Sequence, residues 1–201
     1  MPIYFVNPTG SNTSPYDEDI KGAPTIASLA SSITLNDNDI IQIVGDNGEI
    51  VETVNSSVKG TFRKADSSIS KPIIKLQSSG YINAVSGAQV FHFKDLILYK
   101  DASDGALDNA FLDAAQMIDP IDITIDSCEL RVVGEFGSVL NANGIVIADA
   151  DEAVTIKNNV FHRIPKSSII INATSESKPA VVANYVIRMN SFKQAIYCAP
   201  V

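Results

Sequence analysis

The stretch that decides the fold is a short phrase that the second half of the chain contains four times. The copies are FHFKDLIL from Phe91, ITIDSCEL from Ile123, VTIKNNVF from Val154 and YVIRMNSF from Tyr185. Within each copy, apolar residues alternate with polar ones, and this period of two is typical of a β-strand. A phrase that returns at a fixed interval indicates a repeat architecture.

The four copies align on Phe93, Ile125, Ile156 and Ile187, which are almost equally spaced along the chain. Equivalent positions in the four copies form three further columns. Two of these columns are apolar, and the third, at the bend inside the phrase, also contains polar residues. They are Phe91, Ile123, Val154 and Tyr185; Leu98, Leu130, Phe161 and Phe192; and Leu96, Cys128, Asn159 and Asn190. One coil of chain per repeat, each lying on the last, would bring these columns inside the molecule. The pattern therefore predicts an all-β stack of coils.

The beginning of the chain predicts a cap for this stack. Residues 3–6 form a short predicted strand, and the Gly-, Pro- and Ser-rich segment 7–24 is a loop. Thr25 then precedes apolar residues at helical spacing, which predicts an amphipathic helix of about ten residues with Thr25 as its N-cap. A strand follows at residues 39–45. A lone helix beside the first strands would cover the exposed end of a repeat fold.

The segment Val54–Ser70 does not fit the period. Counting back from Phe93 by the interval that separates Phe93 from Ile125 reaches Thr61, in KGTFRKAD, which does not match the phrase. We therefore expect an excursion or a distorted first coil there, with a strand resuming at 72–77. Residues 100–110 and 172–181 are predicted loops, and GIVIAD and SIIINA are the expected third strands of their coils.

The segment 3–77 resembles a known superfamily. Its stretches IYFVNPTG, PTIASLASSI, DNDIIQIVGDNGEIVET and SKPIIKLQS look like the opening of pectin-lyase-like proteins. Asn38-Asp39 stands where Gly-Asp is usual, and the later segment Gly48–Glu52 lacks the usual tyrosine. The resemblance implies a right-handed, single-stranded parallel β-helix (a solenoid) with a short N-terminal capping helix. It says little about chemistry, because the superfamily includes lyases, hydrolases, esterases, epimerases and non-catalytic viral spikes.

Length and composition limit the classes of partner. With 201 residues, 45% of them hydrophobic, and a mean hydropathy of +0.12, we expect one domain over 1–201: an N-terminal strand, loop and helix in 1–38, and coils in 39–201. The net charge of −8 and only 15 Lys and Arg residues argue against nucleic acid, and also against an anionic membrane surface.

Cysteines and the N-terminus bear on the compartment. Cys128 and Cys198 are too few for a disulfide framework, and Cys128 falls in an inward column, which predicts a buried thiol. The start MPIYFVNPTG has no basic region followed by an apolar stretch, and no run is long enough to span a membrane. We therefore expect a protein that acts inside a cell or is assembled into a particle there, unless a signal was removed.

The other end of the chain predicts a binding partner. No helix or polar cap follows Tyr197 in the sequence. A last coil without a cap presents unpaired backbone groups and a section of the apolar core. We expect a symmetry mate, a partner chain or further residues of a longer parent protein to cover this end.

Outward columns supply the candidate ligand-binding residues. Arg131, His162 and Lys193 form a predicted basic stripe on an acidic protein, and such a stripe could hold an acidic glycan. Asp126 and Lys157 are an opposite-charge pair on adjacent coils. A solvated strand face explains both patterns without a ligand.

Acidic loops supply the candidate metal ligands. Asp149, Asp151 and Glu152 lie close together in one short loop, Asp101 lies near Asp104, and Asp37 near Asp39. Carboxylates at such spacing are typical Ca²⁺ ligands, and Ca²⁺ is the ion that the resembling pectate lyases use. None of these segments matches a complete calcium-loop signature, so we expect no obligatory cofactor, with Ca²⁺ as the one candidate.

The chain lacks the motifs of several enzyme classes. It contains no adjacent Asp-Asp pair, which the resembling polygalacturonases would bring, no Gly-x-Ser-x-Gly and no phosphate loop. His92 and His162 fall on outward strand positions. We therefore assign no catalytic residue.

Two functional hypotheses remain. The first is a non-catalytic structural protein of a virus or phage particle, such as a spike, fibre or capsid-decorating protein, which assembles as a homotrimer or with other virion proteins. The second is a secreted polysaccharide lyase or glycoside hydrolase, or a fragment of one, acting on an acidic polysaccharide. The short length, the missing carboxylate constellation and the uncovered end favour the first.

Overall fold

The described residues form three parallel β-sheets and one short α-helix. The computed structural model describes residues 1–53, 56–77, 80–104, 107, 109–115, 117, 122–134, 142–147, 153–173, 180–183, 186–188 and 196–200. The helix is α1 (Ile26–Ser32), and two 3-10 turns, η1 (Asp19–Lys21) and η2 (Ala102–Asp104), lie in loops.

The three sheets are named A, B and C. Sheet A contains β1 (Ile3–Val6), β2 (Ile40–Ile43), β5 (Gly60–Lys64), β8 (Val90–Lys94), β11 (Asp122–Asp126), β14 (Ala153–Lys157) and β17 (Ala180–Ala183). Sheet B contains β3 (Glu49–Glu52), β6 (Ile73–Leu76), β9 (Ile97–Asp101), β12 (Glu129–Val133), β15 (Val160–His162) and β18 (Val186–Arg188). Sheet C contains β4 (Ser56–Val58), β7 (Ile82–Ala84), β10 (Leu112–Asp113), β13 (Ile145–Ile147), β16 (Ile169–Ala173) and β19 (Ile196–Pro200).

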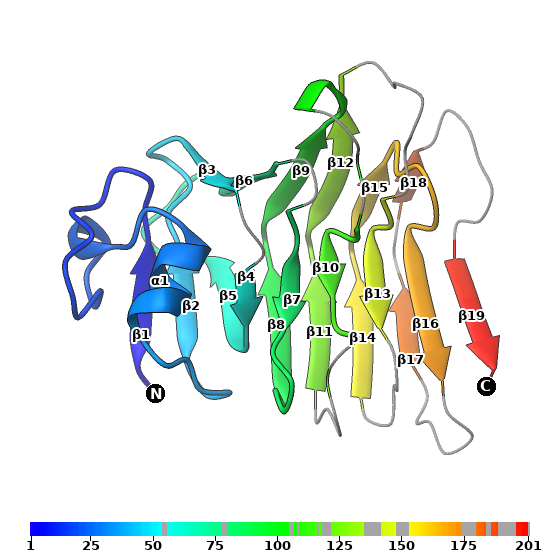
Figure 1. The fold of residues 1–201 in the computed structure, drawn as a ribbon, viewed down its shortest axis with the longest axis horizontal. Coiled ribbons are helices and arrows are strands. Elements are labelled where there is room, and N and C mark those ends of the chain that lie inside the picture. The colour runs from blue at the N-terminus through cyan, green and yellow to red at the C-terminus, as the bar shows by residue number, and fades with distance from the viewer. Residues whose placement is uncertain are drawn as a thin grey trace.

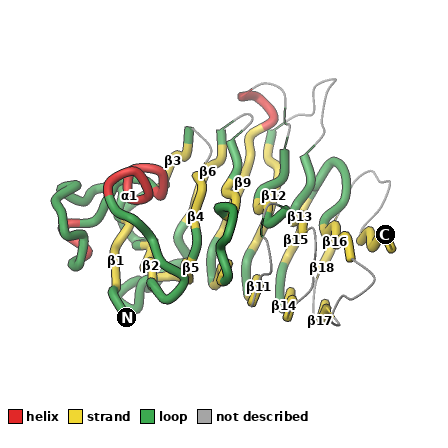
Figure 2. The backbone as a smooth tube through the Cα atoms, turned by 60° about the horizontal axis from the view of Figure 1, so that its bottom comes forward, coloured by secondary structure: helices red, strands yellow, loops and turns green. Residues whose placement is uncertain are grey.

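From β2 onwards the chain visits the sheets in a fixed order. It passes through A, B and C and then returns to A, so that β2, β3 and β4 form one pass and β5, β6 and β7 the next. Each strand of an inner pass pairs in parallel with the strand one pass before it and the strand one pass after it. Figure 1 shows the passes following one another from the N-terminus at one end to the C-terminus at the other, and Figure 2 shows the same order from a second direction. This arrangement is consistent with a β-helix.

Inward side chains line up from pass to pass, as the first three copies of the phrase predict. The matched columns are Phe91, Ile123 and Val154; Phe93, Ile125 and Ile156; and Leu98, Leu130 and Phe161. Each of these side chains is at most 1% exposed. They belong to one hydrophobic cluster that extends from Val6 to Ile171, so the core runs along most of the described stack.

The predicted register of the fourth copy is wrong. Ile156 is in register with Val182, not with Ile187, and Ile187 lies in sheet B in register with Phe161. The last pass is shorter because AVVA (180–183), which is also apolar and β-branched, forms the strand in sheet A. The other residues of the fourth copy that we placed in columns, Tyr185, Asn190 and Phe192, lie outside the described residues.

The predicted excursion over 54–70 is also wrong in part. β5 is a regular strand of sheet A, and its Phe62 is in register with Phe93. The two rings stack with centroids 5.1 Å apart and planes 7° from parallel. The prediction counted back by the interval between Phe93 and Ile125 and so aligned Thr61, one residue before Phe62, with Phe93. A shift of one residue exchanges the inward and outward side chains of a strand, so the match was missed. The irregular part is the loop after β5, at 65–72.

The bend between sheets A and B repeats in each of three passes. Asp95, Ser127 and Asn158 all adopt φ of +57°, and the next residue in each case points inward: Leu96, Cys128 and Asn159. Asn159 is fully buried. Its Oδ1 accepts from Cys128 N–H at 2.8 Å, and its Nδ2 donates to the Ile125 carbonyl at 2.9 Å. The polar residue is tolerated in this column because it satisfies two buried backbone groups of the previous pass.

The helix forms where expected and is shorter than expected, with seven residues. The Thr25 side chain accepts from Ser28 N–H at 3.0 Å as the N-cap, and Ile26 and Leu29 are buried. The Glu52 carboxylate, on β3, also accepts from the first helical N–H groups, those of Ile26 and Ala27. The helix is therefore fixed to the first pass of strands by apolar contact and by a buried carboxylate.

Candidate functional site

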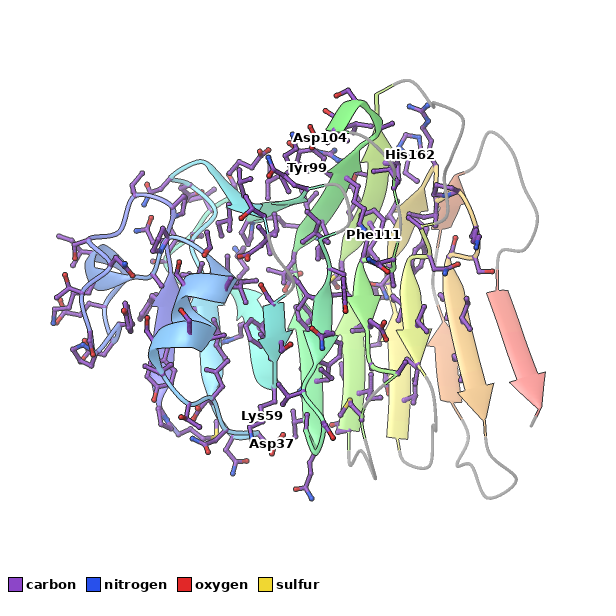
Figure 3. All side chains as sticks on the ribbon, in the orientation of Figure 1. Asp37, Lys59, Tyr99, Asp104, Phe111 and His162 are labelled. Carbon is purple, nitrogen blue, oxygen red and sulfur yellow. The ribbon has the colours of Figure 1, made fainter. Side chains whose placement is uncertain are left out.

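The predicted basic stripe lies on the outer face of sheet B. Four side chains follow one another on consecutive strands β6, β9, β12 and β15, and we call them the sheet B column: Lys75, Tyr99, Arg131 and His162. They point outward because the alternate residues of the same strands fill the core. Figure 3 shows Tyr99 and His162 on the same side of the stack. Arg131 and His162 are thus neighbours, as predicted.

The next position of this column differs from the prediction. Arg188, on β18, is in register with His162, where we expected Lys193. The difference follows from the short last pass. Lys193 lies outside the described residues, and so do the predicted calcium ligands Asp149, Asp151 and Glu152, so both roles stay predictions.

Tyr99 is the most constrained member of the column. Lys75 Nζ lies 6.0 Å from the centroid of the ring, and Arg131 Cζ lies 5.7 Å from it. These distances are within the range of cation–π contacts. The phenol donates to Glu49 Oε2 at 2.5 Å. Burial, with the hydrogen bond to Glu49, raises the pKa of Tyr99 far above its ordinary value of 10.0, so the phenol stays a donor.

The cations of the column are matched by carboxylates. Lys75 Nζ forms an ion pair with Asp104 Oδ2 at 3.0 Å and donates a hydrogen bond to Asp104 Oδ1 at 3.4 Å, and this hydrogen bond raises the pKa of Lys75 (Figure 3 labels Asp104). Arg131 lies 3.3 Å from Glu129 Oε1. The positive charges of Lys75 and Arg131 are therefore largely balanced by neighbouring carboxylates, and the column is not a strongly positive surface.

The other acidic residues considered for Ca²⁺ serve the backbone. Asp101 Oδ1 accepts from the Ser103 amide and hydroxyl, at 2.9 and 2.7 Å. Asp37 Oδ1 accepts from two amides, those of Gln89 and Val90, and Asp39 Oδ2 accepts from Asn36 N–H. Within the described ranges no three His, Cys, Asp or Glu side chains come together as a metal site would require.

Sequence reasoning missed a polar cluster on the outer face of sheet A. His92 Nδ1 lies 3.2 Å from Thr61 Oγ1 on β5, and His92 Nε2 lies 3.1 Å from Asp122 Oδ2 on β11. Thr124 donates to the other oxygen of Asp122 at 3.0 Å. The sequence did contain a signal for this cluster. Thr61 and His92 are separated by the same interval as Ile125 and Ile156, which is one repeat. The incorrect phase of β5 concealed it.

The geometry of this cluster differs from that of a hydrogen-bonded catalytic triad. A hydroxyl, an imidazole and a carboxylate in series can activate a nucleophile. The Nε2 contact to Asp122 is short, at 3.1 Å, but it does not form a hydrogen bond, and this nitrogen has no hydrogen-bond partner among the described residues. The three residues lie on the neighbouring strands β5, β8 and β11 of sheet A. Strand-to-strand polar pairing accounts for them.

Comparison of the chain with protein-family models, with characterised proteins and with solved structures gave no match. The resemblance to pectin-lyase-like proteins therefore rests on the sequence segments given above and on the parallel sheets. No helix in the part of the chain that the structure describes has the length and apolar character needed to cross a membrane.

Proposed function

We propose that the chain is a non-catalytic structural protein built on a right-handed, pectin-lyase-like parallel β-helix, and that it acts in a virus or phage particle as a spike, fibre or decoration component. The order of strands through sheets A, B and C supports the β-helix. The right hand is proposed because connections between parallel strands of one sheet are right-handed with rare exceptions.

One observation carries the structural role: the molecule's polar surface groups are used to join its own passes. Lys157 lies 3.7 Å from Asp126 on the adjacent strand, and the Tyr99 phenol on β9 donates to Glu49 on β3. An active site concentrates groups with unmet bonding capacity in a concave place. The described faces instead resemble the solvated sides of a rod.

The last pass supports assembly. Within the described part of the chain, β17, β18 and β19 pair only with β14, β15 and β16, and their other edges face away from the stack. Edges of parallel strands are strong templates for pairing with more polypeptide. We propose that more polypeptide covers them, from a symmetry mate, a partner chain or a longer parent protein, and that the protein is a homotrimer.

The experiment combines size with activity. Sedimentation velocity at micromolar concentration should give a trimer, and incubation with polygalacturonate or alginate, with and without Ca²⁺, should give no unsaturated product absorbing in the ultraviolet and no new reducing ends. A monomer that cleaves either polymer would overturn the proposal.

A second function has one observation in its favour. The sheet B column places Lys75, Arg131 and His162 on nearby strands, and Arg188 follows in register. Strands in a sheet lie about 4.8 Å apart, so such a column could run along an extended acidic polysaccharide. This secreted lyase or hydrolase alternative predicts cleavage in the same assay, and loss of it in Arg131→Ala.

A further inference from the structure

The chain contains two Asn-Gly pairs, and the fold places them in opposite surroundings. Asn47-Gly48 lies in the turn between β2 and β3, where both residues are exposed and Gly48 adopts a φ of +110°. A methyl group in the side-chain position of Gly48 would meet nothing within 4 Å. No described residue accepts a hydrogen bond from the Gly48 N–H. This backbone nitrogen is therefore open to solvent.

The second pair, Asn143-Gly144, is held on both residues. The Gly144 N–H donates to the Ser167 carbonyl at 2.9 Å, and Asn143 Oδ1 accepts from the Ser167 N–H at 3.2 Å. Gly144 is buried, and a methyl group in its side-chain position would lie 2.2 Å from the Ser168 carbonyl oxygen of the next pass. The same two residue types thus occur once in an open turn and once in packed backbone.

The chemistry of an Asn-Gly pair depends on this difference. The glycine nitrogen loses its proton to solvent and attacks the asparagine Cγ, and the new N–Cγ bond closes a five-membered succinimide. The Cγ–Nδ2 bond breaks, and the nitrogen takes up a proton and leaves as ammonia. Water then opens the ring: rupture of the new N–Cγ bond gives aspartate, and rupture of the original peptide bond gives isoaspartate. Glycine favours the attack because it has no Cβ to obstruct it.

We propose that Asn47 deamidates spontaneously in the folded protein, with water as the co-reactant, that the fold protects Asn143, and that the reaction breaks the bond between Asn47 and Asn7. At Asn47 the attacking nitrogen is exposed and can turn toward the side chain. At Asn143 the Gly144 nitrogen must first give up its bond to Ser167 inside packed backbone, so the reaction there waits for local opening.

The bond to Asn7 joins the turn to the N-terminal loop at residues 7–24. Asn47 Nδ2 donates to Asn7 Oδ1 at 3.3 Å, and this oxygen also accepts from the amide and the hydroxyl of Thr9, each at 3.0 Å. A carboxylate at position 47 has no N–H to donate to Asn7. It also adds a negative charge to a turn with an acidic residue on either side of the Asn-Gly pair. Deamidation therefore releases this attachment of the loop.

The test follows both asparagines by peptide mapping with mass spectrometry. The full chain is kept folded in mildly alkaline buffer, and a second sample is kept in concentrated urea. In the folded protein Asn47 should lose its amide roughly ten-fold faster than Asn143 or more, because Asn143 reacts only after local opening. In urea the two rates should become similar. Equal rates in the folded protein, or a difference that persists unchanged in urea, would overturn the role of the fold.

Two variants test the consequence for the loop. Asn47→Asp reproduces the aspartate product, and amide hydrogen exchange in residues 7–24 should be roughly two- to ten-fold faster than in freshly prepared wild type. Asn47→Gln keeps an amide donor but would have to close a six-membered ring, which is slower, so its exchange should stay constant during the incubation while that of the wild type increases. Identical exchange in Asn47→Asp and fresh wild type would contradict the release of the loop.

Discussion

Replacing Asn159 with leucine tests whether successive passes depend on each other through the bend between sheets A and B. The Asn159 side chain is fully buried and satisfies Cys128 N–H and the Ile125 carbonyl of the previous pass, at 2.8 and 2.9 Å. Leucine has a similar shape but no polar atoms. Each buried backbone group left without a partner costs roughly 1–3 kcal/mol, so we expect Asn159→Leu to lower the free energy of unfolding by about 3 kcal/mol.

The assay is urea unfolding followed by circular dichroism, with the midpoint and slope fitted together. Asn83→Leu is the control, because Asn83 lies on the outer face of sheet C and bonds to the exposed Ser57 hydroxyl at 3.0 Å. Its cost should stay within about 0.5 kcal/mol. If Asn159→Leu also changed stability by less than this amount, the bend would not couple the passes and the reasoning would be refuted.

Three further changes have defined outcomes. Phe93→Ala removes a fully buried ring stacked on Phe62 and should cost about 3–5 kcal/mol in the same urea assay, whereas an effect below about 1 kcal/mol would contradict a filled core. Asp46, whose pKa is lowered by the amides of Ser70 and Ile69, adds stability above its ordinary pKa of 3.8 that is lost as the pH falls through its lower folded value. Asp46→Asn should therefore reduce the acid-induced loss in pH-dependent urea curves, and an unchanged acid limb would count against this role. Burial raises the pKa of Glu52, so the stability that the protonated side chain adds is present below its ordinary pKa of 4.5 and is lost as the pH rises through its folded pKa. Glu52→Gln should therefore lack this loss of stability with rising pH. Identical curves of stability against pH for the variant and the wild type would contradict this role of Glu52.

The sequence predicts the repeated core well where the pattern is strict. Phe91, Ile123 and Val154 can be aligned by eye because each alternates with polar residues, and the structure confirms this register. The inward place of Asn159 was also visible, since it recurs at the interval of the columns. The partners that make a buried asparagine stable could not be predicted, because they belong to the backbone of another pass.

Other features depend on information that one period does not contain. Both AVVA and YVIR contain two adjacent β-branched apolar residues, so the sequence alone does not decide which segment joins sheet A in the last pass. Lys100 shows the same limit: it falls in the predicted loop 100–110, yet it is fully buried in β9. Its Nζ lies 3.4 Å from the Asn109 carbonyl and 5.4 Å from the centroid of the Phe111 ring, which is labelled in Figure 3. A lysine is tolerated there because its cation has an oxygen and an aromatic face nearby.

The most direct test of the stacked passes is a pair of cysteines on adjacent strands. Thr124 and Thr155 are in register on β11 and β14 and point outward, so their Cα atoms should lie at the strand spacing of about 4.8 Å, within the range that a disulfide can bridge. Thr61 and Thr124 share the same column two strands apart, at roughly twice that distance. In a Cys198→Ser background, the stack predicts rapid intramolecular oxidation of Thr124→Cys with Thr155→Cys and none of Thr61→Cys with Thr124→Cys. The reverse result, or cross-linking of both pairs alike, would contradict the register on which the account depends.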